Sequence, residues 1–187
     1  MIDPALQLVV RSSLALLLAT AARHKLGDVS RFRSTVESYR VAPASAARAL
    51  SIGIPVIELA LAAMIATGAA PAAAGAGAAI LLGGYGLAMA INVRRGRLDL
   101  DCGCMGPASA VPVSPALVAR NVVLALAATL LVLPVSARAL TPLDGIAVLA
   151  STAALAACWA AGERMLALAP QVALARRRTQ AVPARSA

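Results

Sequence analysis

The chain is organised by long runs of apolar residues, each bounded by charged residues or prolines. Five of these runs approach the roughly 20 residues that a helix needs to cross a bilayer. The expected spans are residues 5–26, 47–68, 72–93, 115–135 and 143–168. The second and third belong to one apolar stretch, which Gly68 and Pro71 divide into a tight helical hairpin. The pattern therefore predicts an all-α integral membrane bundle of five transmembrane helices.

The longest connection, residues 27–46, follows a different pattern. Apolar side chains recur there at helical spacing, with charged residues between them, at Val29, Phe32, Val36 and Tyr39. This spacing predicts a short interfacial amphipathic helix with its aromatic rings at the depth of the lipid headgroups. We expect residues 1–170 to form a single domain and residues 171–187, which are rich in arginine, to form a disordered basic tail.

The composition supports the membrane interpretation and excludes an ordinary soluble domain. Of the 187 residues, 60% are hydrophobic and only 13% are charged, whereas soluble domains carry about 25% charged residues. Aromatic residues make up 2% of the chain, which disfavours a β-rich core. Asp3 and Pro4 stand where a cleavable signal has basic residues, so the first span is expected to be retained.

The net charge of +9 indicates membrane topology rather than nucleic-acid binding. Basic residues flank the apolar runs, and no nucleic-acid motif or aromatic-rich basic groove is present, so we expect the lipid bilayer and no nucleic acid as a partner. With five spans, residues 23–48, residues 94–114 and the C-terminus share one side, which carries most of the arginines. The positive-inside rule then predicts a multi-pass protein of the bacterial inner membrane, with its N-terminus outside and the 94–114 loop in the cytoplasm.

The strongest candidate chemistry lies in the sequence Cys102-Gly103-Cys104. The glycine permits the bend that two cysteines this close need in order to bond, and the small ring would be strained and readily exchanged. A redox pair is the leading interpretation, with half of a metal site or incidental thiols as alternatives. Zinc needs four ligands, and only His24 and an aspartate could join the two thiols, so no metal site is predicted. Cys158, in the fifth span, is either a small hydrophobic residue or a relay thiol.

Polar residues within the spans predict a polar cavity inside the bundle. Glu58 stands alone near the middle of the second span, so it must be protonated or paired with a cation such as Arg120. It is either functional or part of a helix-to-helix hydrogen bond. The candidate cavity residues are Glu58, Tyr85, Asn92, Arg120 and Asn121. Such a cavity could take a quinone or stabilise a thiolate, and no other cofactor is indicated.

A basic cluster is expected at the membrane interface beside the cysteine loop. It consists of His24, Lys25, Arg94, Arg95 and Arg97. Side chains that snorkel to the headgroups explain the first two of these residues, and contact with a quinone or an anion is the alternative.

Taken together, these motifs resemble a known family. The residues that carry the resemblance are His24-Lys25-Leu26, Phe32, Tyr39-Arg40-Val41-Ala42-Pro43, Glu58, Asn92 with Arg95-Gly96-Arg97, Asp101-Cys102-Gly103-Cys104 and Arg120-Asn121. In order and span placement they resemble the MauE methylamine-utilisation membrane family, a relative of the DoxX-like proteins, over residues 5–135. The resemblance implies a membrane factor for maturation of the disulfide-rich small subunit of methylamine dehydrogenase, usually beside a thioredoxin-like protein. By extension it implies a redox-active cysteine pair.

Two functional hypotheses follow. In the first, the protein has thiol–disulfide oxidoreductase activity, and Cys102 and Cys104 exchange disulfides with a thioredoxin-like partner. In the second, it is a noncatalytic membrane scaffold that recruits or protects a maturation partner, such as a methylamine dehydrogenase subunit, through its basic face. A mixed disulfide trapped through either cysteine would distinguish the two.

Overall fold

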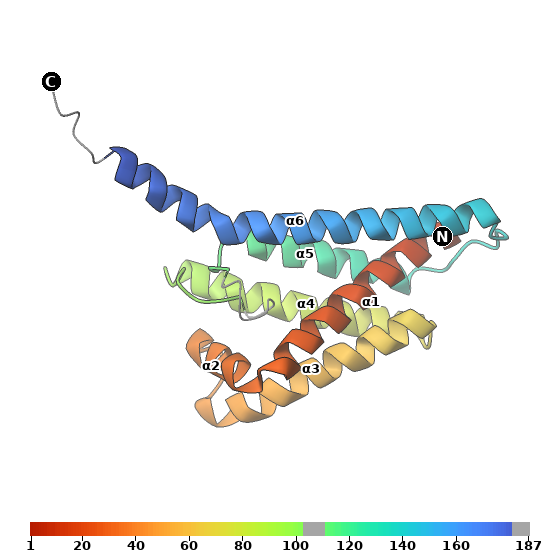
Figure 1. Ribbon diagram of the computed structural model, residues 1–187. Coiled ribbons are helices and arrows are strands. Elements are labelled where there is room, and N and C mark those ends of the chain that lie inside the picture. Colours follow the sequence, from red (N-terminus) through yellow and green to blue (C-terminus); the bar gives the residue numbers. More distant parts are fainter. Residues whose placement is uncertain (103–110, 181–187) are drawn as a thin grey trace, which may run out of the picture.

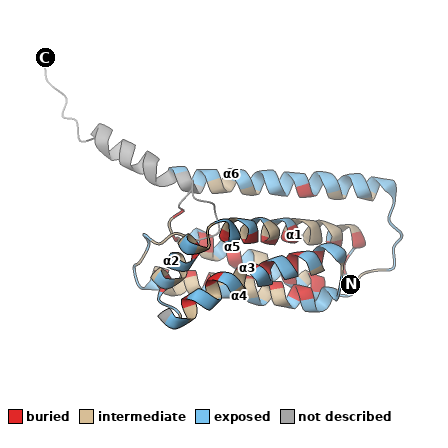
Figure 2. Cartoon of the chain, turned by 60° about the horizontal axis from the view of Figure 1, so that its bottom comes forward, coloured by how far each residue is buried: buried red, intermediate tan, exposed pale blue. Residues whose placement is uncertain are grey.

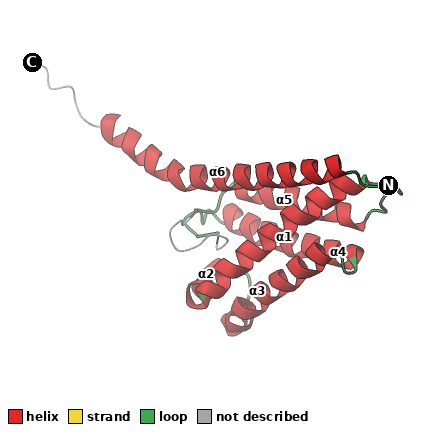
Figure 3. Ribbon diagram, turned by 45° about the vertical axis from the view of Figure 1, so that its right-hand side comes forward, coloured by secondary structure: helices red, strands yellow, loops and turns green. Residues whose placement is uncertain are grey.

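The computed structural model describes the backbone of residues 1–102 and 111–180, which is helical almost throughout (Figure 3). The elements, in chain order, are α1 (Pro4–Gly27), α2 (Val29–Tyr39), α3 (Ala44–Thr67), α4 (Pro71–Arg94), α5 (Pro115–Thr129), the 3-10 helix η1 (Leu130–Val132) and α6 (Pro142–Gln180). Five helical segments are long and apolar enough to cross a membrane: α1, α3, α4, α5 with η1, and α6 as far as Met165. The predicted all-α membrane bundle is confirmed.

Consecutive spans run in opposite directions, so the connections alternate between the two ends of the bundle (Figure 1). Helix α1 packs against α3, and α4 packs against α5. The short helix α2 lies at the end where α1 stops and α3 starts, and it contacts both of them as well as α4. The loop after α4 lies at this same end, which we call the α2 end. Predicted as an amphipathic surface helix, α2 buries Phe32 and Tyr39 against the bundle.

The opposite end is closed by backbone pairing between the first residues and the segment that follows η1. The backbone N–H of Ile2 donates to the Pro134 carbonyl and the N–H of Ser136 donates to the Ile2 carbonyl, both at 2.9 Å. Arg138 Nε donates to Asp3 Oδ2 at 3.0 Å. This hydrogen bond holds the pKa of Asp3 below its ordinary value. The start of α1 is thereby fixed beside the connection to α6.

Close helix packing in the core depends on small residues. The apolar core includes Leu18, Ile65, Ala74, Ala78, Leu82, Ala128 and Leu131, from α1, α3, α4, α5 and η1. At Gly75 of α4 an added Cβ would lie 2.7 Å from Leu131 Cβ and 2.9 Å from the Ala128 carbonyl oxygen. Glycine is therefore required for this approach of α4 to the end of α5, as is typical of helix packing in membranes.

Helix α6 differs from the other spans because it lies on the outside of the bundle. Figure 2 shows its described part as exposed over nearly its whole length. Its Thr152 is buried, with Oγ1 2.6 Å from Ser12 Oγ of α1. The apolar part of this helix ends at Met165, close to the expected end of the span near residue 168, but α6 itself continues through Pro170 to Gln180, so residues 171–180 of the expected tail are helical. Alanine, leucine, arginine and glutamine, which dominate this stretch, all favour helix.

Candidate functional site

Three polar side chains from three different helices meet inside the bundle. Lys25 comes from the last turn of α1, Glu58 from the middle of α3 and Tyr85 from α4. Lys25 Nζ forms an ion pair with Glu58 Oε1 and donates a hydrogen bond to Tyr85 Oη at 3.1 Å. The Tyr85 hydroxyl donates to the same Glu58 Oε1 at 2.7 Å. Lys25 is 3% exposed and Glu58 is fully buried, so we call this group the buried ionic cluster.

The buried ionic cluster corrects two expectations about charged residues. Lys25 does not snorkel to the headgroups, because α2 turns back over the end of α1 and covers it. Its Nζ lies 5.2 Å from the centre of the Phe32 ring of α2 and 4.6 Å from that of Tyr85, within range of cation–π attraction. The cation that pairs with Glu58 is therefore Lys25, and not Arg120 as expected from the sequence.

Local sequence explains why the chain reverses direction after Lys25. The side chain of Asp28 accepts a hydrogen bond from the backbone N–H of Arg31 at 3.0 Å and so caps the N-terminus of α2. This hydrogen bond lowers the pKa of Asp28 from its ordinary value. At the other end of α2, Arg40 adopts a left-handed conformation with φ of 49°, which ends the helix and leads into α3.

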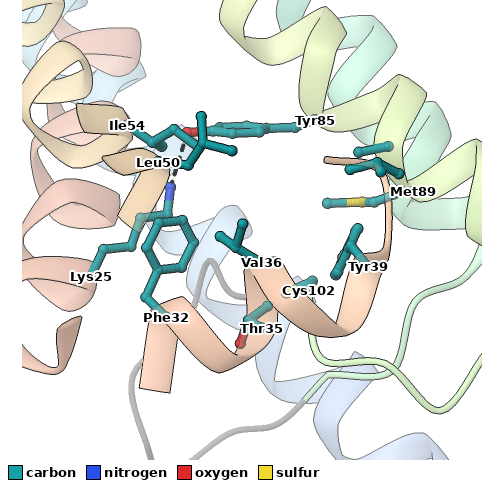
Figure 4. A pocket seen from close by; sticks show the side chains of 12 residues that line it. Lys25, Phe32, Thr35, Val36, Tyr39, Leu50, Ile54, Tyr85, Met89 and Cys102 are labelled. Carbon is teal, nitrogen blue, oxygen red and sulfur yellow. Dashed lines mark hydrogen bonds between the residues drawn. The ribbon is translucent and has the colours of Figure 1, made fainter. Parts of the chain in front are cut away.

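A partly open cavity of about 110 Å³ lies between the buried ionic cluster and the cysteine segment (Figure 4). Its walls are mostly apolar, and only Lys25 and Tyr85 of the cluster reach it. In Figure 4, Lys25 and Phe32 stand on one side, and Tyr39, Met89 and Cys102 stand on the other. The full lining is Lys25, Phe32, Thr35, Val36, Tyr39, Val41, Leu50, Ile54, Tyr85, Ala88, Met89 and Cys102.

Cys102 is held at the cavity wall by short-range backbone pairing. Its N–H donates to the Val111 carbonyl at 3.1 Å, and the side chain is 7% exposed. The preceding Asp101 accepts a hydrogen bond from Arg31 Nη2 of α2 at 2.9 Å. Cys104 lies outside the described residues. Cys158 is exposed on α6 and does not line the cavity.

Asn92 and Arg97 anchor the C-terminal end of α2 rather than lining the cavity. Asn92 Nδ2 donates to the Tyr39 carbonyl at 3.1 Å, and Arg97 Nη2 donates to the Ser38 carbonyl at 2.7 Å. Arg97 Nη1 also donates to Asn92 Oδ1 at 3.1 Å. These bonds tie the end of α4 to the end of α2. Of the predicted basic cluster, Arg94 and Arg95 are exposed and His24 is half-buried, whereas Lys25 lies inside the bundle.

Arg120 and Asn121 belong to α5 and lie apart from Glu58 of α3. Arg120 pairs with Glu163 of α6 at 3.8 Å, and its guanidinium lies 4.4 Å from the centre of the Trp159 ring. Asn121 is buried and its Nδ2 donates to the Leu117 carbonyl at 2.9 Å. The structure thus divides the predicted polar cavity into three separate groups. Within the described residues, no three His, Cys, Asp or Glu side chains are placed to hold a metal ion.

The apolar half of the site could not be found by sequence reasoning. Leu50 and Ile54 belong to an apolar span, where nothing distinguishes a cavity wall from a lipid-facing surface. Lys25 could have been identified from the sequence, because Glu58 is a lone intramembrane carboxylate that needs a cationic partner, and few cations lie near the spans. The ambiguity between Lys25 and Arg120 concerns which helix faces meet, which depends on tertiary packing.

The family model and the individual proteins that the chain matches all point to one family. Residues 3–134 match the family model of methylamine utilisation protein MauE. The chain is 43% identical to MauE of Paracoccus versutus over 122 residues, which cover 65% of this chain and 66% of that protein. It is 39% identical to MauE of Paracoccus denitrificans over 124 residues, covering 66% and 67%. Identity to MauE of Methylorubrum extorquens is 39% over 126 residues, covering 67% and 68%. No solved structure is significantly similar to the chain.

Proposed function

The chain belongs to the MauE family of methylamine utilisation proteins, and from this premise we propose that it is a membrane-embedded thiol–disulfide exchange factor. Cys102 and Cys104 are its reactive pair. The partner is a thioredoxin-like protein, and the client is the small subunit of methylamine dehydrogenase or a similar disulfide-rich protein. The protein lies in the bacterial inner membrane, with the α2 end in the cytoplasm.

The observation that carries this proposal is the position of Cys102. The residue packs in a buried apolar cluster with Tyr39, Met89 and Val113 and also lines a partly open cavity, so a route to it exists along the cavity. Asp101 would disfavour a thiolate on the next residue, but the Arg31 guanidinium at 2.9 Å offsets that negative charge. Backbone pairing with Val111 holds the first cysteine in place while the chain continues toward the second.

The exchange proceeds in two balanced steps. A thiolate of the pair attacks one sulfur of the partner's disulfide, forming a mixed disulfide while the partner's other sulfur leaves as a thiolate and takes up a proton. The second cysteine of the pair then attacks the mixed disulfide and releases the partner's remaining thiol. The pair ends as a Cys102–Cys104 disulfide and the partner, having gained two electrons and two protons, as a dithiol. The reverse sequence oxidises a dithiol partner.

Trapping in cells tests the proposal. Cys102→Ser and Cys104→Ser each remove one half of the pair, so the remaining cysteine should accumulate as a mixed disulfide that acid quenching and alkylation reveal as a reducible mass shift. The double variant should show no such adduct and no function in a complementation assay for growth on methylamine. Cys158→Ala is the matched control and should behave as the wild type.

A noncatalytic scaffold predicts a different result. The double serine variant would then support growth like the wild type, and no adduct would form through either cysteine. That outcome would replace the exchange proposal with recruitment of a maturation partner through the basic α2 end.

A further inference from the structure

The cavity beside the buried ionic cluster has the composition of a small-molecule site. Ligand sites are mostly apolar, with a few polar groups that fix orientation, and here the two polar groups of the buried ionic cluster, Lys25 and Tyr85, lie at one end. Phe32, Tyr39 and Met89 supply flat or adaptable surfaces around the remainder. We propose that this cavity binds the ring of a membrane quinone, with one ring carbonyl oxygen accepting a hydrogen bond from Lys25 Nζ.

The hydrogen bonds of the cluster leave a donor for such a ligand. An ammonium group has three N–H donors, and within the described residues Lys25 uses two of them, on Glu58 and Tyr85. Its Nζ faces the cavity wall beside the Phe32 ring (Figure 4). One N–H therefore remains for an acceptor that enters the cavity.

The charge balance of the buried ionic cluster favours a neutral ligand. Glu58 does not line the cavity, but it contacts Lys25 directly and balances its charge. A carboxylate or phosphate entering this apolar space would introduce a second negative charge, and among the described residues that line the cavity the one cation, Lys25, is already paired, so the desolvation cost would be large. A carbonyl oxygen accepts the same hydrogen bond without carrying a net charge. The site thus favours a neutral carbonyl compound over a fatty acid or a lipid phosphate.

Size and location favour a single ring with an apolar tail. An engineered cavity of about 150 Å³ binds benzene, and this cavity of about 110 Å³ is of comparable size and open on one side, so ring substituents can extend outward. It lies between spanning helices α3 and α4 and the covering helix α2, where a lipid-soluble molecule can reach it. Membrane quinones combine these features.

Binding to the purified full chain in phosphatidylcholine nanodiscs tests the proposal, with decylubiquinone as the probe and empty nanodiscs subtracted. We expect saturable binding of about one probe per chain. Ile54→Trp fills the cavity and should weaken binding at least about tenfold, whereas Ile57→Trp changes an exposed isoleucine of the same helix and should not. If Ile54→Trp does not fold, Leu50→Phe narrows the same wall with a smaller change.

Competition experiments identify the chemistry that is recognised. Decylbenzene has the ring and tail without carbonyl groups, and oleate has a carboxylate on an apolar chain; neither should displace the probe. Displacement by decylbenzene would show an unspecific apolar cavity, and displacement by oleate a carboxylate site. Equal binding by all variants would show partition into lipid. Each of these results would overturn the proposal.

This inference stands independently of thiol exchange. A chain with Cys104→Ser alone loses one half of the exchange pair but keeps every residue that lines the cavity, so it should still bind decylubiquinone. Loss of exchange with retained binding would separate the failure of one proposal from that of the other.

Discussion

A lysine and a glutamate buried inside an apolar bundle stabilise it only as a pair. Each would carry a large desolvation cost alone, and their mutual attraction with the Tyr85 hydrogen bonds offsets it. Oε2 of Glu58 is also buried and accepts no hydrogen bond from the described residues, so the cluster is not fully satisfied. Ionisable side chains buried within membrane spans are candidates for function by default, and this cluster lies beside a cavity.

Removing one partner of this pair should destabilise the protein far more than removing both. Glu58→Gln leaves Lys25 as an unpaired buried cation, at a cost of about 3–5 kcal/mol. We therefore expect a lower folded yield and a lower melting temperature in detergent for Glu58→Gln, and partial recovery of both when Lys25→Met is added. Glu37→Gln is the control, because Glu37 pairs with Arg33 at the exposed surface and should matter little. No recovery in the double variant would contradict the pairing.

At the scale of elements, α2 is the part of the fold that creates the site. It supplies Phe32, Thr35, Val36 and Tyr39 to the cavity, and it covers Lys25. Its C-terminal end is held by hydrogen bonds from Asn92 and Arg97 and by the burial of Tyr39 in an apolar cluster. The position of α2 thus controls both the cavity and the burial of the ionic cluster.

Loss of the Arg97 anchor should loosen α2. Arg97→Gln removes the guanidinium bonds to the Ser38 carbonyl and Asn92, and hydrogen bonds to a charged group contribute about 1.5–3 kcal/mol. Backbone amides of α2 should then exchange hydrogen about tenfold faster or more, which mass spectrometry measures. Arg94→Gln, at an exposed residue of the same segment, should leave the exchange rates unchanged. Unchanged rates in Arg97→Gln would show that apolar packing alone holds α2.

The two glycines Gly75 and Gly84 of α4 should respond oppositely to the same substitution. An alanine at position 75 would press its Cβ against Leu131 and the Ala128 carbonyl, which is backbone and cannot rotate away. An alanine at position 84 would meet no atom within 4 Å. Gly75→Ala should therefore lower the melting temperature, whereas Gly84→Ala should leave it unchanged or raise it, because alanine favours helix. Equal effects would contradict the close contact.

Sequence pattern predicts elements here better than it predicts contacts. The lengths of the apolar runs identified all five spans, and the spacing from Val29 to Tyr39 identified α2. Hydrophobicity does not reveal which face of a span meets its neighbours, so Arg120 was suggested beside Glu58 although it pairs with Glu163. The reversal after Gly27 that buries Lys25 is likewise a tertiary feature, because the spacing of apolar residues predicts where α2 lies along the chain but not what it covers.

At the scale of the whole molecule, the alternation of spans assigns every connection to one of two sides. The α2 end carries Arg23, Arg31, Arg33, Arg40, Arg48, Arg94, Arg95 and Arg97. The other end carries Arg138, which pairs with Asp3 and Asp144, and Arg11, which donates to the Ile65 and Ala66 carbonyls at the end of α3. The asymmetry remains after these structural roles are considered, so it favours the α2 end in the cytoplasm.

Labelling of single cysteines tests this orientation. In a chain whose own cysteines are replaced, Ala69→Cys places a thiol at the exposed turn between α3 and α4, and Ser34→Cys places one on the exposed face of α2. Because the positive-inside rule assigns the arginine-rich end to the cytoplasm, an impermeant maleimide added to intact spheroplasts should label Ala69→Cys at once. Ser34→Cys should be labelled only after permeabilisation. The reverse pattern would place the α2 end and the cysteine loop outside, where an exported subunit could meet them directly, and thiol exchange would then act on the client without transfer across the membrane.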